Sequence, residues 1–317
     1  MLGCPKCGAA LIAQADSADS ADSADSTCSA CGAEYGAHEG IPDLFVPTDD
    51  TGDTGDTDAV TDKVRAFYEA HPFPSYQEGD DRGSLLRRGR AGGFTRALDE
   101  AIPASARVVE LGCGTGQLSM FLGLAGRDCL GVDLSFASLG AATTFRDSAG
   151  LTNVRYVRGN LFRPPVVAGS ADYVLCNGVL HHTADPRGGF ASAARLVKPG
   201  GYLLVGLYNR WGRLLLPLLR SRHREEAGSA RGDAWYLDQH HHPHESRHTA
   251  DEVLRWLDEE GLEYVSTSPP ICFGDAGGGP FERMPRGGRV EHWLAQLSWL
   301  GRAADGGLWV TVARKPG

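Results

Sequence analysis

Four cysteines near the amino terminus have the spacing of a metal site. Cys4 and Cys7 form one CxxC pair, and Cys28 and Cys31 form a second pair after twenty intervening residues. Four thiolates fill the tetrahedral shell of a zinc ion, so we expect structural Zn²⁺ here; a redox pair or a disulfide pair is the alternative. Metal binding, worth about 10–16 kcal/mol in zinc-finger peptides, would stabilise a piece of chain too short to build its own core.

A glycine-rich turn follows the apolar run at residues 107–111. Three glycines alternate with other residues in this turn: Gly112, Gly114 and Gly116. Residue 117 is Gln, so the GxGxxG pattern of dinucleotide-binding proteins is absent. Glu110 precedes the glycines, and Asp133 ends the next apolar run, where its carboxylate can accept both hydroxyls of a ribose. This pattern favours an adenosyl amino acid, a ligand without phosphate that the loop backbone can approach closely.

Short apolar runs alternate with helical patterns from residue 106 onward. Seven runs are expected to be strands: 107–111, 129–135, 154–162, 171–177, 202–209, 263–268 and 308–315. An amphipathic helix at 249–261 has Thr249 as its N-cap and Gly261 at its end. Short strands with helical crossovers predict an α/β protein with a parallel, doubly wound sheet.

These patterns divide the chain into parts. We expect a zinc ribbon at 1–47, a flexible acidic linker at 48–60, a helical lid segment at 61–105, and the sheet domain at 106–317 with a cap inserted at about 210–248. Because the linker separates the ribbon from the sheet, we expect removal of residues 1–58 to leave ligand binding intact.

Five features of the sheet domain fall in register: ELGCGTG, GVDLS, GNLF, the strand end at Asn177, and LVKPGGYLLV. Together they resemble the class I S-adenosylmethionine-dependent methyltransferases, particularly the type 11 group. The resemblance is strong over residues 106–209 and extends over 249–316 by architecture. The ribbon, through its cysteines and its GIPDL exit, resembles small zinc ribbons attached to or partnering with RNA and protein methyltransferases. The resemblance implies a seven-stranded Rossmann-like methyltransferase sheet preceded by a small zinc ribbon.

The same resemblance implies S-adenosylmethionine as cofactor and a set of residues around it. The expected cofactor-binding residues are Glu110, Gly112, Cys113, Gly114, Gly116, Asp133, Leu134, Asn160, Leu161 and Asn177. The glycine backbone would lie against methionine and ribose, Asp133 would bind the ribose hydroxyls, and Leu134 would pack on adenine. Asn160 would contact the adenine amino group, or it is simply a turn residue. Asn177 would present its carbonyl to the methionine amine, while Cys113 is expected to pack within the loop.

Methyl transfer requires a nucleophile in line behind the sulfonium methyl group. A hydroxyl or a cationic amine also needs a base, and three residues at the carboxyl edge of the sheet are candidates: His181, His182 and Tyr208. The alternative is that the histidine pair orients its loop and forms part of the cofactor wall. No (D/N)PP(Y/F) follows the fourth strand, which disfavours methylation of exocyclic amines of nucleic-acid bases. Cys176 follows Leu175 rather than proline, which disfavours covalent catalysis on cytosine carbon.

The segment at 64–77 precedes the sheet and is rich in aromatic residues. Its helix is expected to stop at His71-Pro72, and its side chains are candidates for a lid over the cofactor: Tyr68, Phe73 and Tyr76. Ordinary packing of an accessory helix is the alternative.

The inserted cap is rich in histidine. Three of its histidines are candidates for substrate contact or base catalysis: His242, His244 and His248. With Glu245 they could form a metal site, although Pro243 prevents their placement on one helix face. A polar loop with hydrogen-bonded histidines is the remaining alternative.

The formal net charge of −9 comes from two segments, 15–26 and 48–58, which hold four and five aspartates and no basic residue. The remainder has 31 acidic and 31 basic residues, so net charge excludes no partner. We favour a small-molecule substrate; the alternatives are RNA docked by the ribbon and a protein- or carrier-bound substrate. Apolar stretches such as LLLPLL are too short to span a membrane, and no signal peptide is apparent, so we expect a cytoplasmic protein whose oligomeric state stays open.

Overall fold

The computed structural model describes residues 1–11, 26–48, 55–219, 224, 230–273, 278–300 and 306–317. The Ala-Asp-Ser repeat lies outside these residues apart from Ser26. Among the described helices, none combines the length and the apolar character that a membrane crossing requires.

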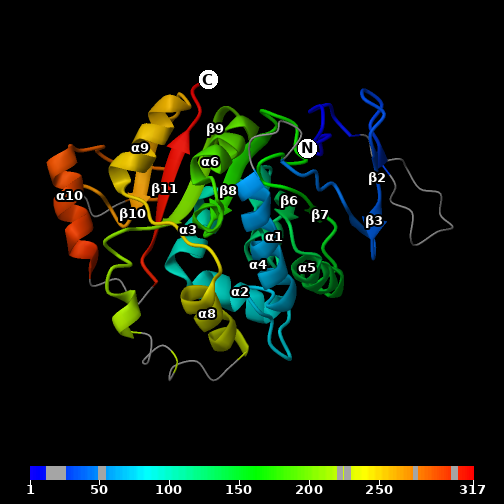
Figure 1. Cartoon of the computed structure of the whole chain (residues 1–317), viewed down its shortest axis with the longest axis horizontal. Coiled ribbons are helices and arrows are strands. Elements are labelled where there is room, and N and C mark those ends of the chain that lie inside the picture. Colours follow the sequence, from blue (N-terminus) through cyan, green and yellow to red (C-terminus); the bar gives the residue numbers. More distant parts are fainter. Residues whose placement is uncertain (12–25, 49–54, 220–223, 225–229, 274–277, 301–305) are drawn as a thin grey trace.

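A seven-stranded sheet forms the centre of the molecule (Figure 1). Its strands lie in the order β10-β11-β9-β8-β5-β6-β7, and β11 runs antiparallel to both of its neighbours. The strands are β5 (Arg107–Leu111), β6 (Asp128–Asp133), β7 (Val154–Arg158), β8 (Ala171–Asn177), β9 (Val197–Tyr208), β10 (Glu263–Ser268) and β11 (Leu308–Arg314). The predicted seven-stranded, Rossmann-like sheet is therefore confirmed, but it is mixed rather than wholly parallel, because β11 runs against both of its neighbours.

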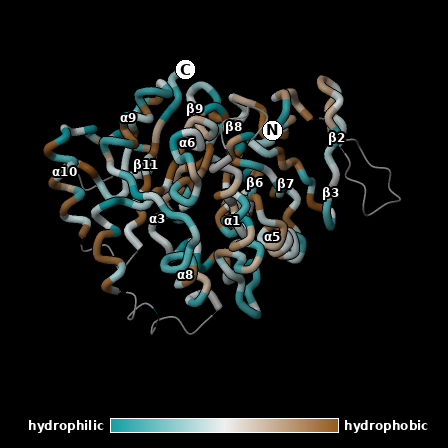
Figure 2. The backbone as a smooth tube through the Cα atoms, viewed as in Figure 1, coloured by the Kyte–Doolittle hydropathy of each residue, from teal (hydrophilic) through white to brown (hydrophobic). Residues whose placement is uncertain are grey.

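Helices cover both faces of this sheet. One face packs against α2 (Arg82–Ala91), α3 (Gly93–Ala101), α4 (Gln117–Gly123) and α5 (Phe136–Ser148). The other face packs against α6 (Pro186–Leu196) and α9 (Ala250–Glu259). Hydrophobic residues follow the central strands in Figure 2. Burial on both faces explains why strands such as RVVEL read as continuous apolar runs rather than alternating ones.

Helix α9 forms where the sequence pattern predicts it. Thr249 caps α9 in a capping box with Glu252, and the helix buries Val253, Trp256 and Leu257 against the sheet. Beyond it, α10 (Arg289–Ser298) lies on the outer side of α9 (Figure 1).

The order of the strands reverses between β5 and β8. The chain leaves β5 through α4 and adds β6 on one side of β5. It later adds β8 on the other side of β5. In doubly wound sheets ligands bind at the carboxyl ends of strands beside such a switch point. The loops after β5, β6 and β8 are therefore the ones that can build a ligand site.

Two further helices lie across the end of the sheet at which β5, β6 and β8 have their carboxyl ends. Helix α1 (Gly55–Ala70) precedes the sheet, and α8 (Ala230–His241) belongs to the inserted cap, together with the short η2 (Leu216–Leu219). Helix α1 begins at Gly55, inside the segment predicted as a linker.

The N-terminal ribbon contains two small hairpins, β1 (Ser26–Thr27) with β2 (Glu34–Tyr35), and β3 (Ala37–His38) with β4 (Ile41–Pro42). It docks on the edge strand β7: the Leu44 amide donates to the Arg158 carbonyl at 2.9 Å, and Asp43 forms a parallel bridge with Arg158. Cys4, Tyr35 and Leu44 share one apolar core with the sheet. The ribbon and the sheet therefore form one packed body, contrary to our expectation of a ribbon separated from the sheet.

Candidate functional site

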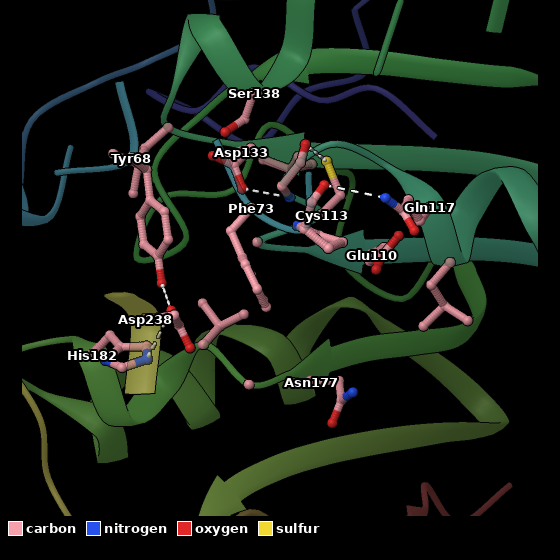
Figure 3. A pocket seen from close by; sticks show the side chains of 18 of the residues that line it. Tyr68, Phe73, Glu110, Cys113, Gln117, Asp133, Ser138, Asn177, His182 and Asp238 are labelled. Carbon is pink, nitrogen blue, oxygen red and sulfur yellow. Dashed lines mark hydrogen bonds and ion pairs between the residues drawn. The ribbon is translucent and has the colours of Figure 1, made fainter. Parts of the chain in front are cut away.

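A cavity of about 510 Å³ opens at the carboxyl ends of β5, β6 and β8. The glycine-rich loop and the end of β6 line one side, and α1, α8 and η1 (Leu180–His182) line the other. Figure 3 shows Tyr68, Asp238 and His182 grouped together, apart from Glu110 and Gln117. The volume lies in the range of ordinary ligand sites.

The glycine-rich loop has a conformation and a closeness of packing that require glycine. Gly112 and Gly114 have φ angles of 68° and 52°. A Cβ atom on Gly114 would lie 2.1 Å from the Phe73 carbonyl oxygen, and one on Gly112 would lie 2.4 Å from a Val179 methyl group. The loop therefore presents bare backbone to the cavity and to the segment that follows α1.

Asp133, at the end of β6, faces the cavity from beneath this loop. Its Oδ2 accepts the Gly114 amide at 2.8 Å, and its Oδ1 accepts the Ser135 amide at 2.9 Å. Burial raises the pKa of Asp133, while these backbone hydrogen bonds act in the opposite direction. Each oxygen keeps a further lone pair for a ligand hydroxyl.

Glu110, at the end of β5, is buried and lines the same cavity. Its Oε2 accepts the Ser119 amide of α4 at 3.0 Å. Burial raises the pKa of Glu110 to about 7, although the hydrogen bonds from Ser119 lower it. The carboxyl group thus joins β5 to the first turn of α4 and sits close to its point of half-protonation at neutral pH.

Eight of the ten predicted cofactor residues line the cavity: Glu110, Gly112, Cys113, Gly114, Asp133, Leu134, Leu161 and Asn177. Asn177 ends β8 opposite Gly206 of β9. A Cβ atom added to Gly206 would lie 1.9 Å from the Asn177 Oδ1. Among the described residues this Oδ1 has no hydrogen-bond partner. Gly206 thus leaves room for an amide oxygen that is buried and available to a donor.

The other two predicted residues, Gly116 and Asn160, lie outside the cavity lining. Gly116 caps α4, with the Tyr156 hydroxyl 2.2 Å from where a Cβ atom would stand. The Asn160 Nδ2 donates to the Val46 carbonyl of the ribbon at 2.9 Å, and its Oδ1 accepts the Phe162 amide. The side chain expected to contact adenine therefore holds the ribbon exit in place.

Tyr68, Asp238 and His182 form the opposite end of the cavity. The Tyr68 hydroxyl donates to Asp238 Oδ1 at 2.8 Å, and His182 Nε2 lies 4.0 Å from the same oxygen. Gln239 Nε2 donates to Asp238 Oδ2 at 3.0 Å, and the Tyr208 hydroxyl lies 3.4 Å from that oxygen. Asp238 is thus a buried carboxyl group held by donors on both oxygens and directed into the cavity.

His182 has a defined tautomer when it is neutral. Its Nδ1 lies 2.9 Å from the His244 carbonyl oxygen, which can only accept, so Nδ1 carries the hydrogen and Nε2 carries a lone pair. Burial lowers the pKa of His182 to about 4, so the ring is neutral near pH 7. Within the described part of the chain, Nε2 has no hydrogen-bond partner.

Tyr208, at the end of β9, packs against the guanidinium group of Arg213 and the imidazole ring of His181. The Arg213 guanidinium lies 3.5 Å from the centre of the Tyr208 ring, and His181 stacks on it at 3.6 Å. Arg213 is fully buried, donating to Gln239 Oε1 at 2.6 Å and the Gly306 carbonyl at 2.7 Å, and pairing with Glu245. This guanidinium ties the cap to the end of β9. His181 lies behind Tyr208 rather than on the cavity wall.

Of the three lid candidates, two line the cavity and one packs elsewhere. Tyr68 and Phe73 line the cavity, whereas Tyr76 stacks on Phe145 at 4.6 Å and donates to the Thr115 carbonyl. Helix α1 is fixed in place because the Glu69 carboxylate accepts the amides of Phe136 and Ala137 at the start of α5, at 2.7 and 2.9 Å.

The cap histidines do not converge on one point. The rings of His242 and His182 lie 3.5 Å apart between their centroids with a tilt of 31°, and the His244 carbonyl accepts from both rings. His248 lies apart, beside the end of β9, where its amide donates to the Tyr208 carbonyl and its ring is hydrogen-bonded to Ser246 and Glu252. Glu245 is paired with Arg213. Over the described residues, the histidines with Glu245 therefore form no metal-ligand group.

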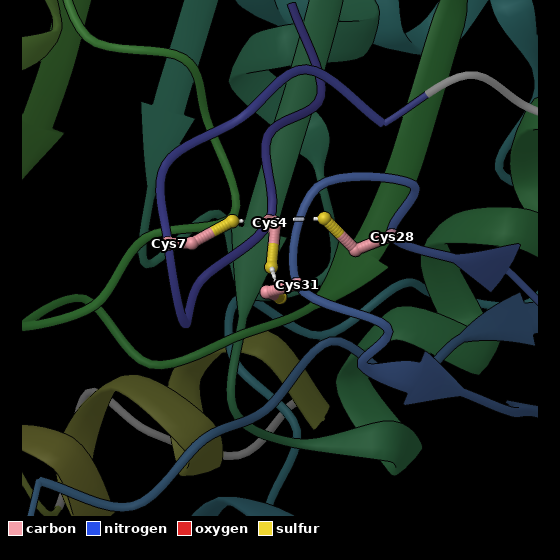
Figure 4. A group of neighbouring side chains, drawn as sticks. All are labelled: Cys4, Cys7, Cys28 and Cys31. Carbon is pink, nitrogen blue, oxygen red and sulfur yellow. Dashed lines mark hydrogen bonds between the residues drawn. The ribbon is translucent and has the colours of Figure 1, made fainter.

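The four cysteines of the ribbon do converge (Figure 4). All four sulfur atoms lie within 4.8 Å of one another, with Cys4 and Cys31 3.7 Å apart and Cys7 and Cys28 3.6 Å apart. A tetrahedral zinc ion with bonds of about 2.3 Å separates its sulfurs by about 3.8 Å. The cysteine cluster fits such an ion.

Asp238, Gln239 and Arg213 are the residues of this site that the sequence analysis missed. They lie in the inserted cap, which contains no recognised motif. A buried arginine and an Asp-Gln pair near the end of a cap helix leave no distinctive spacing in the sequence.

Residues 86–267 match the family described as the methyltransferase domain. The chain belongs to this family. Family and fold together are those of the class I S-adenosylmethionine-dependent methyltransferases, as the sequence analysis predicted. The recognised domain runs from α2 through β10 and includes the whole inserted cap.

Curated relatives match this chain over part of their length. An uncharacterised protein of Synechococcus sp. is 26% identical over 253 residues, covering 67% of this chain and 61% of the relative. The ubiquinone biosynthesis O-methyltransferase of Methylococcus capsulatus is 37% identical over 108 residues, covering 34% of this chain and 45% of that protein. The chain spans about half the length of the curated relatives it matches.

Among solved structures, the geranyl diphosphate C-methyltransferase of Streptomyces coelicolor has the same fold. It aligns with a TM-score of 0.50 and 15% identity, over 81% of this chain and 98% of that one. At this identity the likeness concerns the fold alone.

Proposed function

We propose that the enzyme transfers the methyl group of S-adenosylmethionine to a small molecule bound between α1 and the cap. One observation carries this proposal: a single cavity joins the glycine-rich loop and Asp133 to the Tyr68, Asp238 and His182 group. Helices α1 and α8 both contribute to its wall, and a volume of about 510 Å³ suits a cofactor with a small acceptor.

The cofactor would occupy the half of the cavity beside the glycine-rich loop. The free lone pairs of Asp133 suit the two ribose hydroxyls, and Leu134 and Leu161 suit the adenine faces. The unpartnered Oδ1 of Asn177 suits the methionine ammonium group. S-adenosylmethionine, when bound, supplies a methyl group already activated by the sulfonium charge, so the protein needs only to position the nucleophile and accept its proton.

His182 is the residue that we propose accepts this proton. Its Nε2 lone pair faces the cavity, and the His244 carbonyl fixes its tautomer. Asp238, 4.0 Å away, would stabilise the imidazolium that forms. Tyr208 and His181 support this pair by stacking, which is a positioning role.

We also propose that the cysteine cluster binds Zn²⁺. The four thiolates would occupy every position of a tetrahedral ion, so the metal would hold the ribbon together and take no part in methyl transfer. The ribbon in turn holds β7 and the loop after it, through Asp43, Leu44 and Val46.

Methyl transfer into a fractionated cell extract tests the substrate class. The extract is separated into RNA, protein and small-molecule fractions, and each is incubated with the enzyme and S-adenosylmethionine carrying a labelled methyl group. We expect label in the small-molecule fraction that resists nuclease and protease, and its loss with the Asp238→Asn variant. Label in RNA released by nuclease, or in protein released by protease, would overturn the proposal and make the ribbon a docking module.

A further inference from the structure

Among the described residues that line the cavity, Arg88 of α2 alone is a lysine or an arginine. Its Nη1 donates to Asp80 Oδ1 at 2.5 Å, so one end of the guanidinium is paired. Although the side chain as a whole is 29% exposed, its Nη2 is buried and has no hydrogen-bond partner within the described part of the chain. A buried charged donor without an acceptor costs free energy, so this nitrogen marks a position that a bound acceptor would complete.

Asp80 fixes the paired end of this guanidinium. The Asp80 Oδ1 also accepts the Ser84 hydroxyl at 3.2 Å, and its Oδ2 accepts the Gln77 amide at 3.0 Å. Burial raises the pKa of Asp80, but the hydrogen bonds from Gln77 and Arg88 act in the opposite direction and hold it below its ordinary value. Asp80 is therefore a carboxylate at neutral pH, and it orients Arg88 without using Nη2.

Arg88 lies at the end of the cavity that holds the glycine-rich loop. Helix α2 packs on α4, which begins directly after this loop. The Tyr76 hydroxyl donates to the Thr115 carbonyl of the loop at 2.9 Å. Burial raises the pKa of Tyr76, Arg88 lowers it and Glu110 raises it, so both charged groups lie near this hydroxyl. Arg88 therefore belongs to the half of the cavity that we assign to the cofactor.

The other ionisable side chains of the cavity lining offer no positive charge to an anion. Glu110, Asp133 and Asp238 are carboxyl groups, which attract the sulfonium and the ammonium of the cofactor and repel its carboxylate. Burial lowers the pKa of His182 to about 4, so this ring is neutral near pH 7. Within the described lining, the one negative group of the cofactor therefore has a single cationic partner, Arg88.

We infer that Arg88 binds the carboxylate of the cofactor's methionine group through Nη2, and thereby selects ligands that carry the intact amino acid. This inference rests on the proposed function, because it needs the cofactor in the half of the cavity beside the glycine-rich loop. Nη2 carries two hydrogens, and a hydrogen bond from a guanidinium to a carboxylate is among the stronger ones in proteins. Asp80 acts through Arg88, which is a positioning role.

The ratio of two affinities tests the inference. S-adenosylhomocysteine and its decarboxylated analogue, which keeps the adenosine, the sulfur and the amino group, are titrated calorimetrically into the full-length enzyme and into its Arg88→Met variant. The unaltered enzyme should bind S-adenosylhomocysteine roughly 10- to 100-fold more tightly than the analogue. Arg88→Met should reduce this ratio to less than about threefold, because the carboxylate loses its hydrogen-bond donor. Both affinities are measured in each variant, so a general loss of stability does not imitate this result.

Two further variants separate a direct contact from a change of charge or packing. Arg87→Met removes an equal charge from an exposed position of the same helix and should leave the ratio unchanged. Asp80→Asn breaks the same ion pair but keeps the guanidinium, so it should keep most of the ratio. A fall in either variant as large as that in Arg88→Met would show an effect of net charge or of local packing, and would overturn the inference.

The remaining outcomes separate this inference from the proposed function. Equal affinity of the unaltered enzyme for the two ligands, or an unchanged ratio in Arg88→Met, would overturn the role of Arg88 and leave the proposed methyl transfer standing. Failure of both ligands to bind the unaltered enzyme would overturn the cofactor half of the cavity, and with it both proposals.

Discussion

Where the ribbon docks on the sheet, the polar side chains are paired within the protein, whereas in the cavity several buried polar atoms have no partner among the described residues. Arg158 holds Asp43 with two hydrogen bonds of 3.0 and 2.9 Å, and Asn160 holds the Val46 carbonyl. In the cavity, Asn177 Oδ1 and His182 Nε2 are buried and have no hydrogen-bond partner among the described residues. The paired groups hold the ribbon on the sheet, and the unpaired groups leave positions that a bound ligand completes.

Among the changes considered for the ribbon, loss of the metal should lower the stability of the protein most. Removing the proposed Zn²⁺ should lower the free energy of unfolding by several kcal/mol, less than the roughly 10–16 kcal/mol seen in zinc-finger peptides, because docking on β7 retains part of the ribbon. At about 2–4 °C per kcal/mol, the Tm should fall by about 10 °C. Thermal unfolding of metal-stripped and reloaded protein measures this change.

Variants of single cysteines supply the control for that experiment. Cys4→Ser should reproduce the loss of Tm, whereas Cys272→Ser, a buried cysteine outside the cluster, should change it by much less. An unchanged Tm in protein shown to be free of metal would contradict the role of the cluster. Because the ribbon shares its core with the sheet, removal of residues 1–48 should also destabilise the enzyme.

Breaking the contact between the ribbon and β7 should have a smaller effect. Asp43→Ala leaves Arg158, whose side chain is 11% exposed, without its carboxylate and between the Phe45 and Phe136 rings. We expect a loss of about 1–3 kcal/mol of unfolding free energy in denaturant titrations. Asp147→Ala, which breaks an exposed pair with Arg146, should cost no more than about 1 kcal/mol. Similar losses in the two variants would show that the ribbon contact is no stronger than a surface ion pair.

The buried histidines and the buried carboxyl groups should change the stability with pH in opposite directions. Burial lowers the pKa of His182 to about 4 and that of His242 to about 3, so between these values and about 6.5 the unfolded chain binds more protons and stability falls as pH falls. Burial raises the pKa of Glu110 to about 7, and raises those of Asp133 and Asp238, so these carboxyl groups act in the opposite direction. Glu110→Gln should therefore steepen the loss of stability between pH 6.5 and 4.5. An unchanged or shallower slope in denaturant titrations would contradict the buried state of Glu110.

The sequence predicted what depends on local pattern. The apolar runs gave the strands, and the spacing of glycines with Asp133 gave the loop that now lines the cavity. The cysteine spacing likewise gave a cluster with the separations of a tetrahedral site. Each of these features depends mainly on residues near one another in the chain, so their spacing in the sequence is enough to predict them.

What the sequence left open depends on contacts between distant segments. Asp238 meets Tyr68 from 170 residues away, and Asn160 meets Val46 from 114 residues away. No spacing rule connects such pairs. Asn160 matched a family position for adenine contact, but the ribbon that docks beside it takes its side chain, which only the packed structure reveals.

The central claim is that one cavity has a cofactor half at Asp133 and an acceptor half at Asp238. Calorimetric titration of S-adenosylhomocysteine into the Asp133→Ala and Asp238→Asn variants tests it without knowledge of the substrate. Asp133→Ala should weaken binding by about 1–3 kcal/mol, because the ribose hydroxyls lose their acceptor, while Asp238→Asn should bind as the unaltered enzyme does. Unchanged affinity in Asp133→Ala, or an equal loss in Asp238→Asn, would contradict the division of the cavity.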